Sequence, residues 1–546
     1  MVLAVIVIAV VGLLHVPLGD YMARVYTARR HWRLETVLYR MCGVDPDAEQ
    51  RWTRYLTSLL AFSAVSVAGL YAILRLQGRL PFSLDHPGMP AALAFNTAVS
   101  FATNTSWQNY AGEATLGHLA LAAGLGTQAF ASAAVGLAAG VALIRGLVRH
   151  RTDQVGNFWV DLVRGVVRIL LPLAAVSAIV LIGLGVVQNL AGPHGVTTLA
   201  GSGQTILGGP VGSWEPIKLM SGDGGGIFNV NSAHPFENPN ALSNAFEIVL
   251  MLLVPTAFIR AFGRMVGDRR QGWALLAVAG ILFVGAVAAA TGAQHLHHNT
   301  VPVAVGTAAE GTESRFGVPA STLFGVAATG SADGAANASY DSFTSLGGGT
   351  LMATIMLSEV SPGGAGSGLY GLLMLALLAV FLGGLMIGRT PEYLRKRLQV
   401  REMKLVALYA LVSPTLILAG TGLAIALPAG RASIGNPGAH GLSEVAYALT
   451  STTQSNGSAF GGFTGNTPFY NSLLAIVMLA GRYLPMILVL ALAGSLARQR
   501  RGVVNAGTLP SHRPLFVGLV TASVLVFTAL DFVLILALGP LAEGLA

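Results

Sequence analysis

The most regular feature of the chain is the alternation of long apolar segments with shorter polar connections. Runs such as 1–16, 371–387, 405–427 and 473–496 carry few charges. As helices they are long enough, or nearly so, to cross a hydrocarbon core of about 30 Å. About ten such segments occur, at roughly 1–18, 55–76, 118–144, 165–188, 242–262, 273–293, 345–388, 404–427, 470–497 and 514–538. The pattern predicts an all-α polytopic membrane protein.

The basic residues fall on alternate connections. Twenty-five of the 32 lysines and arginines lie within 20–54, 145–168, 260–270, 389–404 and 498–501. The positive-inside rule places these connections in the cytoplasm and both termini outside. The net charge of +8 is thereby explained without a nucleic-acid partner.

The opposite connections contain four short apolar pieces, each followed by small polar residues and glycine. The pieces are 91–102, 214–221, 320–329 and 442–452. We call the polar segments that follow them the first to fourth loops, at 103–108, 222–229, 330–337 and 453–460. A piece of this length is too short to span a membrane but suits a re-entrant half-helix. Thr105, Gly224, Gly334 and Gly457 mark the same place in each loop and recur 110 to 123 residues apart, a degenerate repeat.

Four such loops at one depth predict a cation pore. Irregular backbone at membrane depth is tolerated where it lines a cavity, and the C-terminal ends of re-entrant helices favour a cation. Glycine lets successive carbonyls point the same way because a positive φ costs it little. Such carbonyls can replace the water shell of an alkali cation. One loop alone would be read as a flexible external loop.

The seventh apolar segment is interrupted in its middle. Pro362 and the glycines around it, within Glu359–Gly368, cannot continue a helix. The alternative is an ordinary external loop between two short spans, but that reading would upset the alternation of the arginines.

Five motifs carry a resemblance to a known family. They are GDGGGIFNVNSAHPFENPN, SFATNTSWQNYAGE, LGGGTLMATIMLSEVSPGGAGSGLYG, GRTPEYL and QSNGSAFGGFTGNTPFYN. The chain resembles, from its first helix to its last, the potassium-binding subunits of bacterial potassium-transporting ATPases (the KdpA family), within the superfamily of potassium transporters. The resemblance implies four pore repeats of helix, half-helix, filter loop and helix. The four repeats are expected at 55–150, 151–270, 271–402 (which contains the broken helix) and 403–501. An extra helix and cytoplasmic loop precede them at 1–54, and a C-terminal helix follows at 502–546.

The resemblance also implies the site. K⁺ is the transported ion, with no organic cofactor. The filter positions map onto Asn104, Thr105, Ser106, Gly222, Asp223, Gly224, Ala332, Asp333, Gly334, Ser455, Asn456 and Gly457, with Gln108 close by. The interrupted segment becomes a gating loop that includes Glu359, Gly363 and Gly364, with Glu359 facing Arg389.

The implied partners supply the energy. The family assembles with a P-type ATPase catalytic subunit, a single-span accessory subunit and often a small membrane peptide, embedded in lipid in the bacterial inner (plasma) membrane. The chain itself contains neither GxxxxGK[ST] nor an Asp-Lys-Thr-Gly phosphorylation motif. We therefore expect no catalytic residues here and ATP hydrolysis in the partner.

Several interpretations stay open. Asp223 stands where the family usually has Asn, and Ser106 also replaces an Asn. The carboxylates of Asp223 and Asp333 could attract cations or simply accept backbone N–H bonds. Glu113, Glu237 and Glu247 are expected to anchor backbone amides near the pore entrance, with a part in cation attraction as the alternative. His295, His297 and His298 form a cluster whose spacing alone is weak evidence for a metal site.

Two other functions compete with the potassium-pump subunit. One is a stand-alone channel or symport subunit of the Trk/Ktr type, which would share the four-repeat pore but not the long motifs GRTPEYL and HPFENP. The other is a membrane-embedded enzyme acting on lipid, which would need acid–base or metal-binding residues at one membrane depth.

Overall fold

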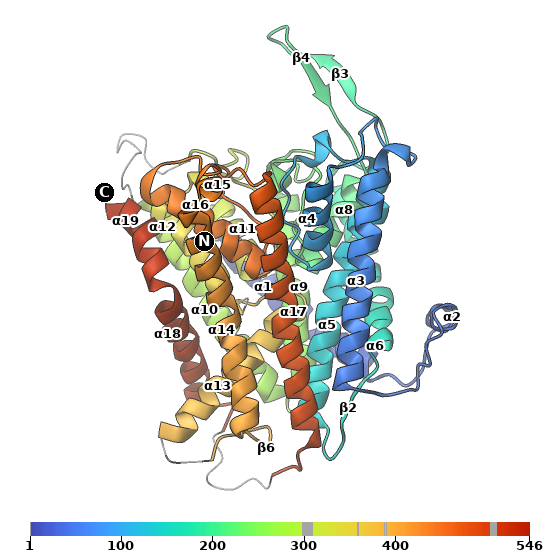
Figure 1. The fold of residues 1–546 in the computed structure, drawn as a ribbon, viewed down its shortest axis with the longest axis vertical. Helices are drawn as coiled ribbons and strands as arrows, with labels where there is room; N and C mark the ends of the chain where they lie inside the picture. Colours follow the sequence, from blue (N-terminus) through green and yellow to red (C-terminus); the bar gives the residue numbers. More distant parts are fainter. Residues whose placement is uncertain are drawn as a thin grey trace.

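A computed structural model describes residues 2–296, 309–357, 360–386, 388, 390–502 and 510–545. Long helices run side by side along one axis, and a β-hairpin projects from one end of the bundle (Figure 1). The prediction of a polytopic all-α protein is confirmed, because ten helical segments among the described residues are long and apolar enough to cross a membrane. They contain α1 (Val2–Thr27), α3 (Trp52–Leu76), α5 (Thr127–Val148), α6 with α7 (Phe158–Arg164 and Leu171–Gly183), α9 (Ala241–Met265), α10 (Arg269–His295), α13 (Ser367–Met386), α14 (Val400–Ala426), α17 (Pro468–Arg498) and α18 (Pro514–Leu536).

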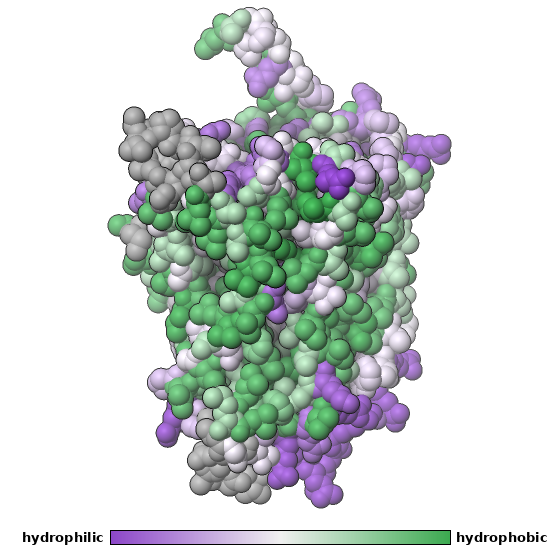
Figure 2. All heavy atoms as spheres, turned by 60° about the vertical axis from the view of Figure 1, so that its left-hand side comes forward, coloured by the Kyte–Doolittle hydropathy of each residue, from purple (hydrophilic) through white to green (hydrophobic). Residues whose placement is uncertain are grey.

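The surface agrees with a lipid environment. Hydrophobic side chains cover the middle of the face seen in Figure 2, and hydrophilic ones gather toward its two ends. Side chains such as Ile179 and Leu530 are 72% and 71% exposed. An apolar belt of this extent would not be stable in water, so it marks the part of the molecule that contacts hydrocarbon.

Four shorter helices occupy the predicted half-helix positions. α4 (Ala91–Ala102) has the predicted bounds, whereas α8 (Val211–Ser221), α11 (Gly317–Gly330) and α16 (Gly438–Thr453) begin a few residues earlier than expected. Their C-terminal halves are almost completely buried. Each helix ends inside the protein, where the loop that follows it must find its hydrogen-bond partners.

The seventh segment is broken, as the proline and glycines predicted. α12 (Ser345–Met356) and α13 (Ser367–Met386) are separate helices. Of the residues between them, those from Val360 to Ala365 are buried. The interruption is therefore an internal feature of the protein rather than an exposed loop.

The two ends of the bundle differ in chemistry. α1 and α9 start at the same end, where Leu3 and Ala4 line a small cavity together with Ala241 and Asn244. At the other end Arg145 donates to the carbonyl oxygen of Tyr26, near the end of α1. We call this the basic end, because the arginine-rich connections lie there, and we call the opposite one the hairpin end.

Several small elements were not predicted from the sequence. At the hairpin end β3 (His194–Thr197) pairs antiparallel with β4 (Gly203–Ile206). At the basic end β1 (Gln50–Arg51) pairs with β2 (Gln154–Gly156), and β5 (Glu392–Tyr393) pairs with β6 (Lys396–Arg397). The remaining helices are α2 (Arg33–Met41), α15 (Pro428–Arg431) and α19 (Ala542–Leu545).

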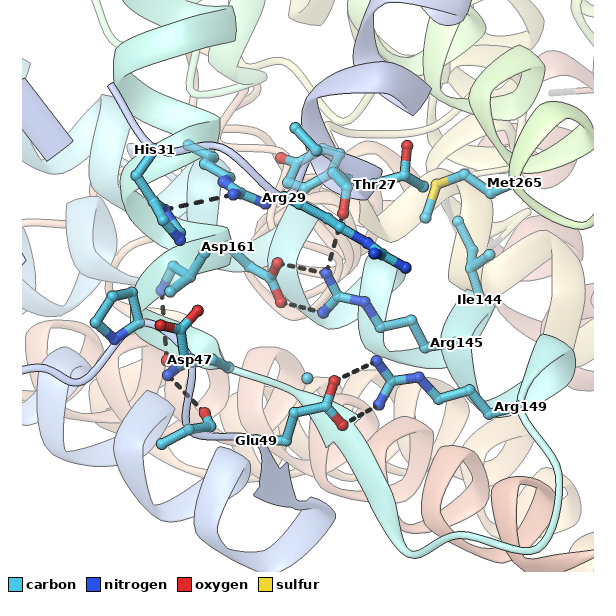
Figure 3. A pocket seen from close by; sticks show the side chains of 18 of the residues that line it. Thr27, Arg29, His31, Asp47, Glu49, Ile144, Arg145, Arg149, Asp161 and Met265 are labelled. Atoms are coloured by element: carbon cyan, nitrogen blue, oxygen red, sulfur yellow. Dashed lines mark hydrogen bonds and ion pairs between the residues drawn. The ribbon is translucent and has the colours of Figure 1, made fainter. Parts of the chain in front are cut away.

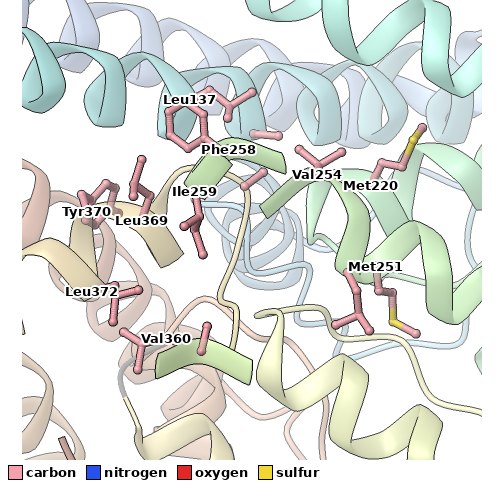
Figure 4. Close-up of a cluster of buried hydrophobic side chains, with 14 of the residues drawn as sticks. Leu137, Met220, Met251, Val254, Phe258, Ile259, Val360, Leu369, Tyr370 and Leu372 are labelled. Carbon is pink, nitrogen blue, oxygen red and sulfur yellow. The ribbon is translucent and has the colours of Figure 1, made fainter. Parts of the chain in front are cut away.

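A buried apolar cluster holds the interrupted segment in place. Leu137 from α5, Phe258 from α9 and Leu369 from α13 lie together with Val360 from the interruption (Figure 4). α5 and α9 pack closely, since a Cβ added at Gly140 would lie 2.6 Å from the Phe258 ring. Dense packing of this kind transmits displacement instead of absorbing it, so a shift of the interruption would be passed on to the helices around it.

Candidate functional site: a ring of four loops

Hydrogen bonds join the four loops in two pairs. Asn104 of the first loop donates from Nδ2 to the carbonyl oxygens of Ser221 and Gly222, at 3.2 and 3.0 Å. In the same manner Asn456 of the fourth loop donates from Nδ2 to the carbonyl oxygen of Asp333, at 3.2 Å. The first loop is thereby bound to the second, and the third to the fourth.

Close backbone contacts complete the ring. A Cβ added at Gly224 would lie 2.0 Å from the backbone nitrogen of Gly334, which places the second loop against the third. A Cβ added at Gly457 would lie 2.0 Å from the carbonyl oxygen of Thr105, which places the fourth loop against the first. Only glycine allows backbones to approach this closely. The four loops therefore surround one common centre.

The backbone follows a shared conformation around this ring. The first of the three predicted site residues in every loop has a positive φ, of 61°, 72°, 55° and 56° at Asn104, Gly222, Ala332 and Ser455. The third has a positive φ in three loops, of 50°, 76° and 98° at Ser106, Gly224 and Gly457. Positive φ values at corresponding positions show that the loops share an unusual local backbone conformation. Repetition of this costly conformation in non-glycine residues indicates a functional constraint.

A cavity of about 490 Å³ lies against one side of the ring, and we call it the vestibule. The third site residue of every loop contributes to its wall, namely Ser106, Gly224, Gly334 and Gly457. Gln108 lines it as well, and exchanges two hydrogen bonds with the backbone of Gly226, at 2.9 and 3.2 Å. Eleven of the twelve predicted site residues are buried, and Gly457 is partly exposed.

The opposite side of the ring faces a small cavity and the interrupted seventh segment. This cavity, of only about 20 Å³, lies next to Ser455 and Arg482. The interrupted seventh segment also packs against the third loop, since the backbone N–H of Gly363 donates to the carbonyl oxygen of Gly330 at 2.8 Å. Gly364 lies near Ala332. The expected pairing of Glu359 with Arg389 falls outside the described residues.

A buried charge network supports the second loop. Lys218 Nζ contacts the carboxylates of Glu215 and Glu237 at 2.8 and 2.7 Å, and all three side chains are fully buried. The same Nζ donates to Asn231 Oδ1 at 2.7 Å, and Asn231 Nδ2 donates to the carbonyl oxygen of Gly224 at 2.8 Å. A chain of contacts thus leads from an ion pair to a carbonyl in the ring.

Sequence reasoning did not assign Lys218 or Asn231 to the site. The available signal was Lys218 itself, a lysine four residues before a glycine-rich loop in an otherwise apolar half-helix. A charged side chain within a membrane-embedded helix is usually paired with an opposite charge and often belongs to a functional site.

The expectation that glutamates anchor backbone amides is confirmed for two of three residues. Glu237 Oε1 accepts from the backbone N–H groups of Ile227 and Phe228, both at 3.0 Å. Glu113 accepts from the backbone N–H of Asn229 at 2.8 Å. Among the described residues, Glu247 receives no such bond from a backbone amide; it lies near Lys218 instead.

Asp223 and Asp333 each use one carboxylate oxygen within the ring. The hydroxyl of Ser106 donates to Asp223, and the backbone N–H of Ala335 donates to Asp333 at 2.9 Å. The second oxygen of each is buried and has no hydrogen-bond partner among the described residues. Asp223 and Asp333 therefore each hold the structure of a loop with one carboxylate oxygen. The other oxygen of each side chain is available to water or a cation.

A second charged cluster lies at the hairpin end. His440, near the start of α16, contacts Asp341 through Nε2 at 2.9 Å and Glu543 through Nδ1 at 3.0 Å. Asp341 and Glu543 accept hydrogen bonds from His440 and so raise its pKa to about 10. The two carboxylates that contact His440 favour its charged form, so we read this cluster as an ion-pair clamp; Glu444 also lies near it. Of the histidine cluster expected from the sequence, the structure describes only His295.

Comparison with known proteins gives a consistent result along the whole chain. The family described as "Potassium-transporting ATPase A subunit" matches residues 5–545. A protein of Clavibacter michiganensis named "Potassium-transporting ATPase potassium-binding subunit" is 54% identical over 99% of this chain and 98% of its own length. Proteins of the same name from Kineococcus radiotolerans and Mycolicibacterium smegmatis are 54% and 55% identical, over 97% and 98% of this chain and 95% and 97% of theirs.

Proposed function

Because the chain belongs to the family of potassium-transporting ATPase A subunits, we propose that the ring of four loops is its potassium filter. The chain is the potassium-binding subunit of a pump in which another subunit hydrolyses ATP. The match extends along the whole chain, so the alternative of a stand-alone Trk/Ktr-type channel is not supported.

The closed ring carries this proposal. K⁺ would enter the vestibule, shed water and bind to carbonyl oxygens of the twelve residues named above as filter positions. Carbonyl dipoles are suitable ligands for a dehydrated alkali cation because they are hard, neutral oxygen donors. The two unpaired carboxylate oxygens of Asp223 and Asp333 would add negative potential close to the ring.

The interrupted seventh segment would then act as the gate. It lies against the ring on the side opposite the vestibule, through the contact between Gly363 and Gly330. An ion held in the ring would pass only if this segment moves or if the ion leaves sideways into a partner. We place Glu359 and Arg389 in the same gate on the basis of the family resemblance.

The assembly and its orientation are part of the proposal. The basic end would face the cytoplasm of a bacterial cell and the hairpin end the outside, so that both termini are outside. The partners would be a P-type ATPase subunit, a single-span accessory subunit and a small membrane peptide. The proposed repeats are 55–150, 151–270, 271–402 and 403–501, each supplying one loop to the ring.

The test uses the purified complex with its ATPase subunit. ATPase activity is measured against increasing K⁺, Rb⁺ and Na⁺ for the unmodified complex and for the Gly224→Asp and Gly457→Asp variants. In the unmodified complex, we expect K⁺ to stimulate ATPase activity at concentrations far below those at which Na⁺ does. In both variants, we expect the affinity for K⁺ to be weaker and Na⁺ to stimulate activity as well. Unchanged ion selectivity in both variants would rule out the filter assignment.

A further inference from the structure

A second cavity, of about 590 Å³, lies at the basic end, away from the ring. The end of α1, the end of α5, strand β2 and helix α6 form its walls, together with residues 28–31 and 46–49 (Figure 3). Nothing in the proposed path of potassium uses this space. Seven charged side chains line it, in keeping with the arginine-rich connections at this end.

Two of its four arginines are already neutralised. Arg145 makes two hydrogen bonds to the carboxylate of Asp161, at 2.5 and 2.8 Å. Arg149 makes two to Glu49, both at 2.6 Å. Both pairs are seen as parallel contacts in Figure 3. These guanidinium groups shape the cavity but are not available to a ligand.

The other two arginines have no carboxylate partner among the described residues. Arg164 is only 4% exposed, and its Nε has no hydrogen-bond partner there. One of its terminal nitrogens reaches His31 Nδ1, at 3.4 Å. Arg29 lines the cavity and is exposed. The carboxylates nearest to Arg164, those of Glu35 and Asp161, are already paired with Arg168 and Arg145. A buried guanidinium without an anion of its own is costly, so Arg164 marks a place where an anion is needed.

A second unsatisfied donor lies in the same wall. The hydroxyl of Tyr26 is buried without a hydrogen-bond partner among the described residues. Asp47 is the one lining carboxylate outside the two ion pairs, and its side chain is exposed. A buried cation and a buried hydroxyl together form a donor set for an oxyanion.

We propose that this cavity binds a phosphate group, held by Arg164 and Tyr26 inside and by Arg29 at the rim. Guanidinium groups are the preferred partners of phosphate because their planar N–H donors match its oxygens. The phosphate could belong to an anionic phospholipid headgroup in the leaflet at the basic end or to a small soluble phosphate compound. The inference is independent of the filter assignment.

The experiment measures ligand binding to the purified complete complex in neutral detergent. The probes are phosphatidylglycerol and inorganic pyrophosphate, and the readouts are adduct mass in native mass spectrometry and the thermal unfolding midpoint. We expect saturable binding of at least one probe. Binding of phosphatidylglycerol alone identifies a headgroup site, and binding of pyrophosphate without lipid identifies a soluble ligand. Absence of saturable binding by both probes would overturn the proposal.

Variants separate this site from general surface charge. Arg29→Gln and Arg164→Gln are each expected to weaken binding about tenfold or more, the usual loss for a charge-assisted hydrogen bond. Tyr26→Phe keeps the packing and is expected to weaken binding severalfold. Arg33→Gln removes an exposed arginine outside the cavity and should leave binding unchanged.

Two results would contradict the site even if Arg164→Gln does not fold. One is unchanged affinity in both Arg29→Gln and Tyr26→Phe. The other is equal weakening in Arg33→Gln, which would show that only net charge matters. Binding seen with the isolated chain but lost in the complete complex would show instead that a partner's acidic side chain fills the cavity.

Discussion

The side-chain amide of Asn231 donates a 2.8 Å hydrogen bond to the carbonyl oxygen of Gly224, a member of the ring. Its orientation is determined by Lys218, which contacts Asn231 Oδ1 at 2.7 Å. Because an ammonium group only donates, it must face the amide oxygen, and the NH₂ group is left to face the carbonyl. A charge outside the ring thereby fixes one of its oxygens.

Replacing Asn231 with Asp should therefore loosen ion selection. The substitution puts a carboxylate oxygen where the NH₂ group was, and it repels the Gly224 carbonyl. We expect K⁺ affinity in the ATPase assay to fall about tenfold, comparable to the loss of one hydrogen bond together with a new repulsion. Asn229→Asp is the matched control, since it adds the same charge to the vestibule wall without touching that carbonyl. Equal effects of the two variants would refute the orienting role.

Removing Lys218 should destabilise the whole protein. Lys218→Met leaves Glu215 and Glu237 buried without their cation, a change that typically costs about 3–5 kcal/mol. We expect a clear drop in the unfolding midpoint, measured by tryptophan fluorescence in detergent. Lys404→Met, at an exposed position, should leave the midpoint where it was. A midpoint equal to that of the unmodified protein would mean that the network is not structural.

A methyl group at Gly224 should distort the ring. Gly224 has a φ of +76°, and its Cβ would collide with the backbone of Gly334. Gly201 in the β3–β4 hairpin is a matched control, because its φ is +80° and a Cβ there meets nothing within 4 Å. Both alanine variants carry the backbone strain of about 1 kcal/mol. Only Gly224→Ala should also weaken K⁺ stimulation, measured as the half-maximal K⁺ concentration of ATPase activity.

The carboxylate of Asp223 should strengthen K⁺ binding. Asp223→Asn keeps an acceptor for the Ser106 hydroxyl but removes a negative charge next to the ring. We expect the apparent K⁺ affinity to fall severalfold, up to about tenfold, and to fall less at high salt. An unchanged affinity at low salt would leave Asp223 with its structural role alone.

The clamp around His440 should make stability depend on pH. Its pKa is raised from 6.5 to about 10 in the folded protein, so the folded state binds the proton more tightly than the unfolded state. The contribution is complete below pH 6.5, declines as the pH rises and is lost above about pH 10.

The unfolding midpoint measured across this pH window should therefore fall more steeply in the unmodified protein than in His440→Asn. His194→Asn, in the exposed strand β3, should keep the steeper fall. Identical pH profiles for the unmodified protein and His440→Asn would contradict an ion-pair clamp.

Much of the architecture follows from local sequence patterns. Charge-poor segments of sufficient length determine the membrane spans, because a helix is the cheapest way to satisfy backbone polar groups in hydrocarbon. Pro362 and its neighbouring glycines determine where the seventh segment is broken, and the short apolar piece 91–102 corresponds to α4. These features depend on residues close together in the chain, so their pattern can be read directly.

Only the tertiary structure decided how the four loops meet. The contacts of Asn104 with Gly222 and of Gly457 with Thr105 join residues more than a hundred positions apart, and no periodicity encodes them. Periodicity does not encode the contact of His440 with Asp341 either, nor the absence of a carboxylate partner for Arg164 among the described residues. Partners of buried polar groups are set by three-dimensional packing around them, whereas the sequence by itself determines mainly which segments enter the membrane and which remain polar.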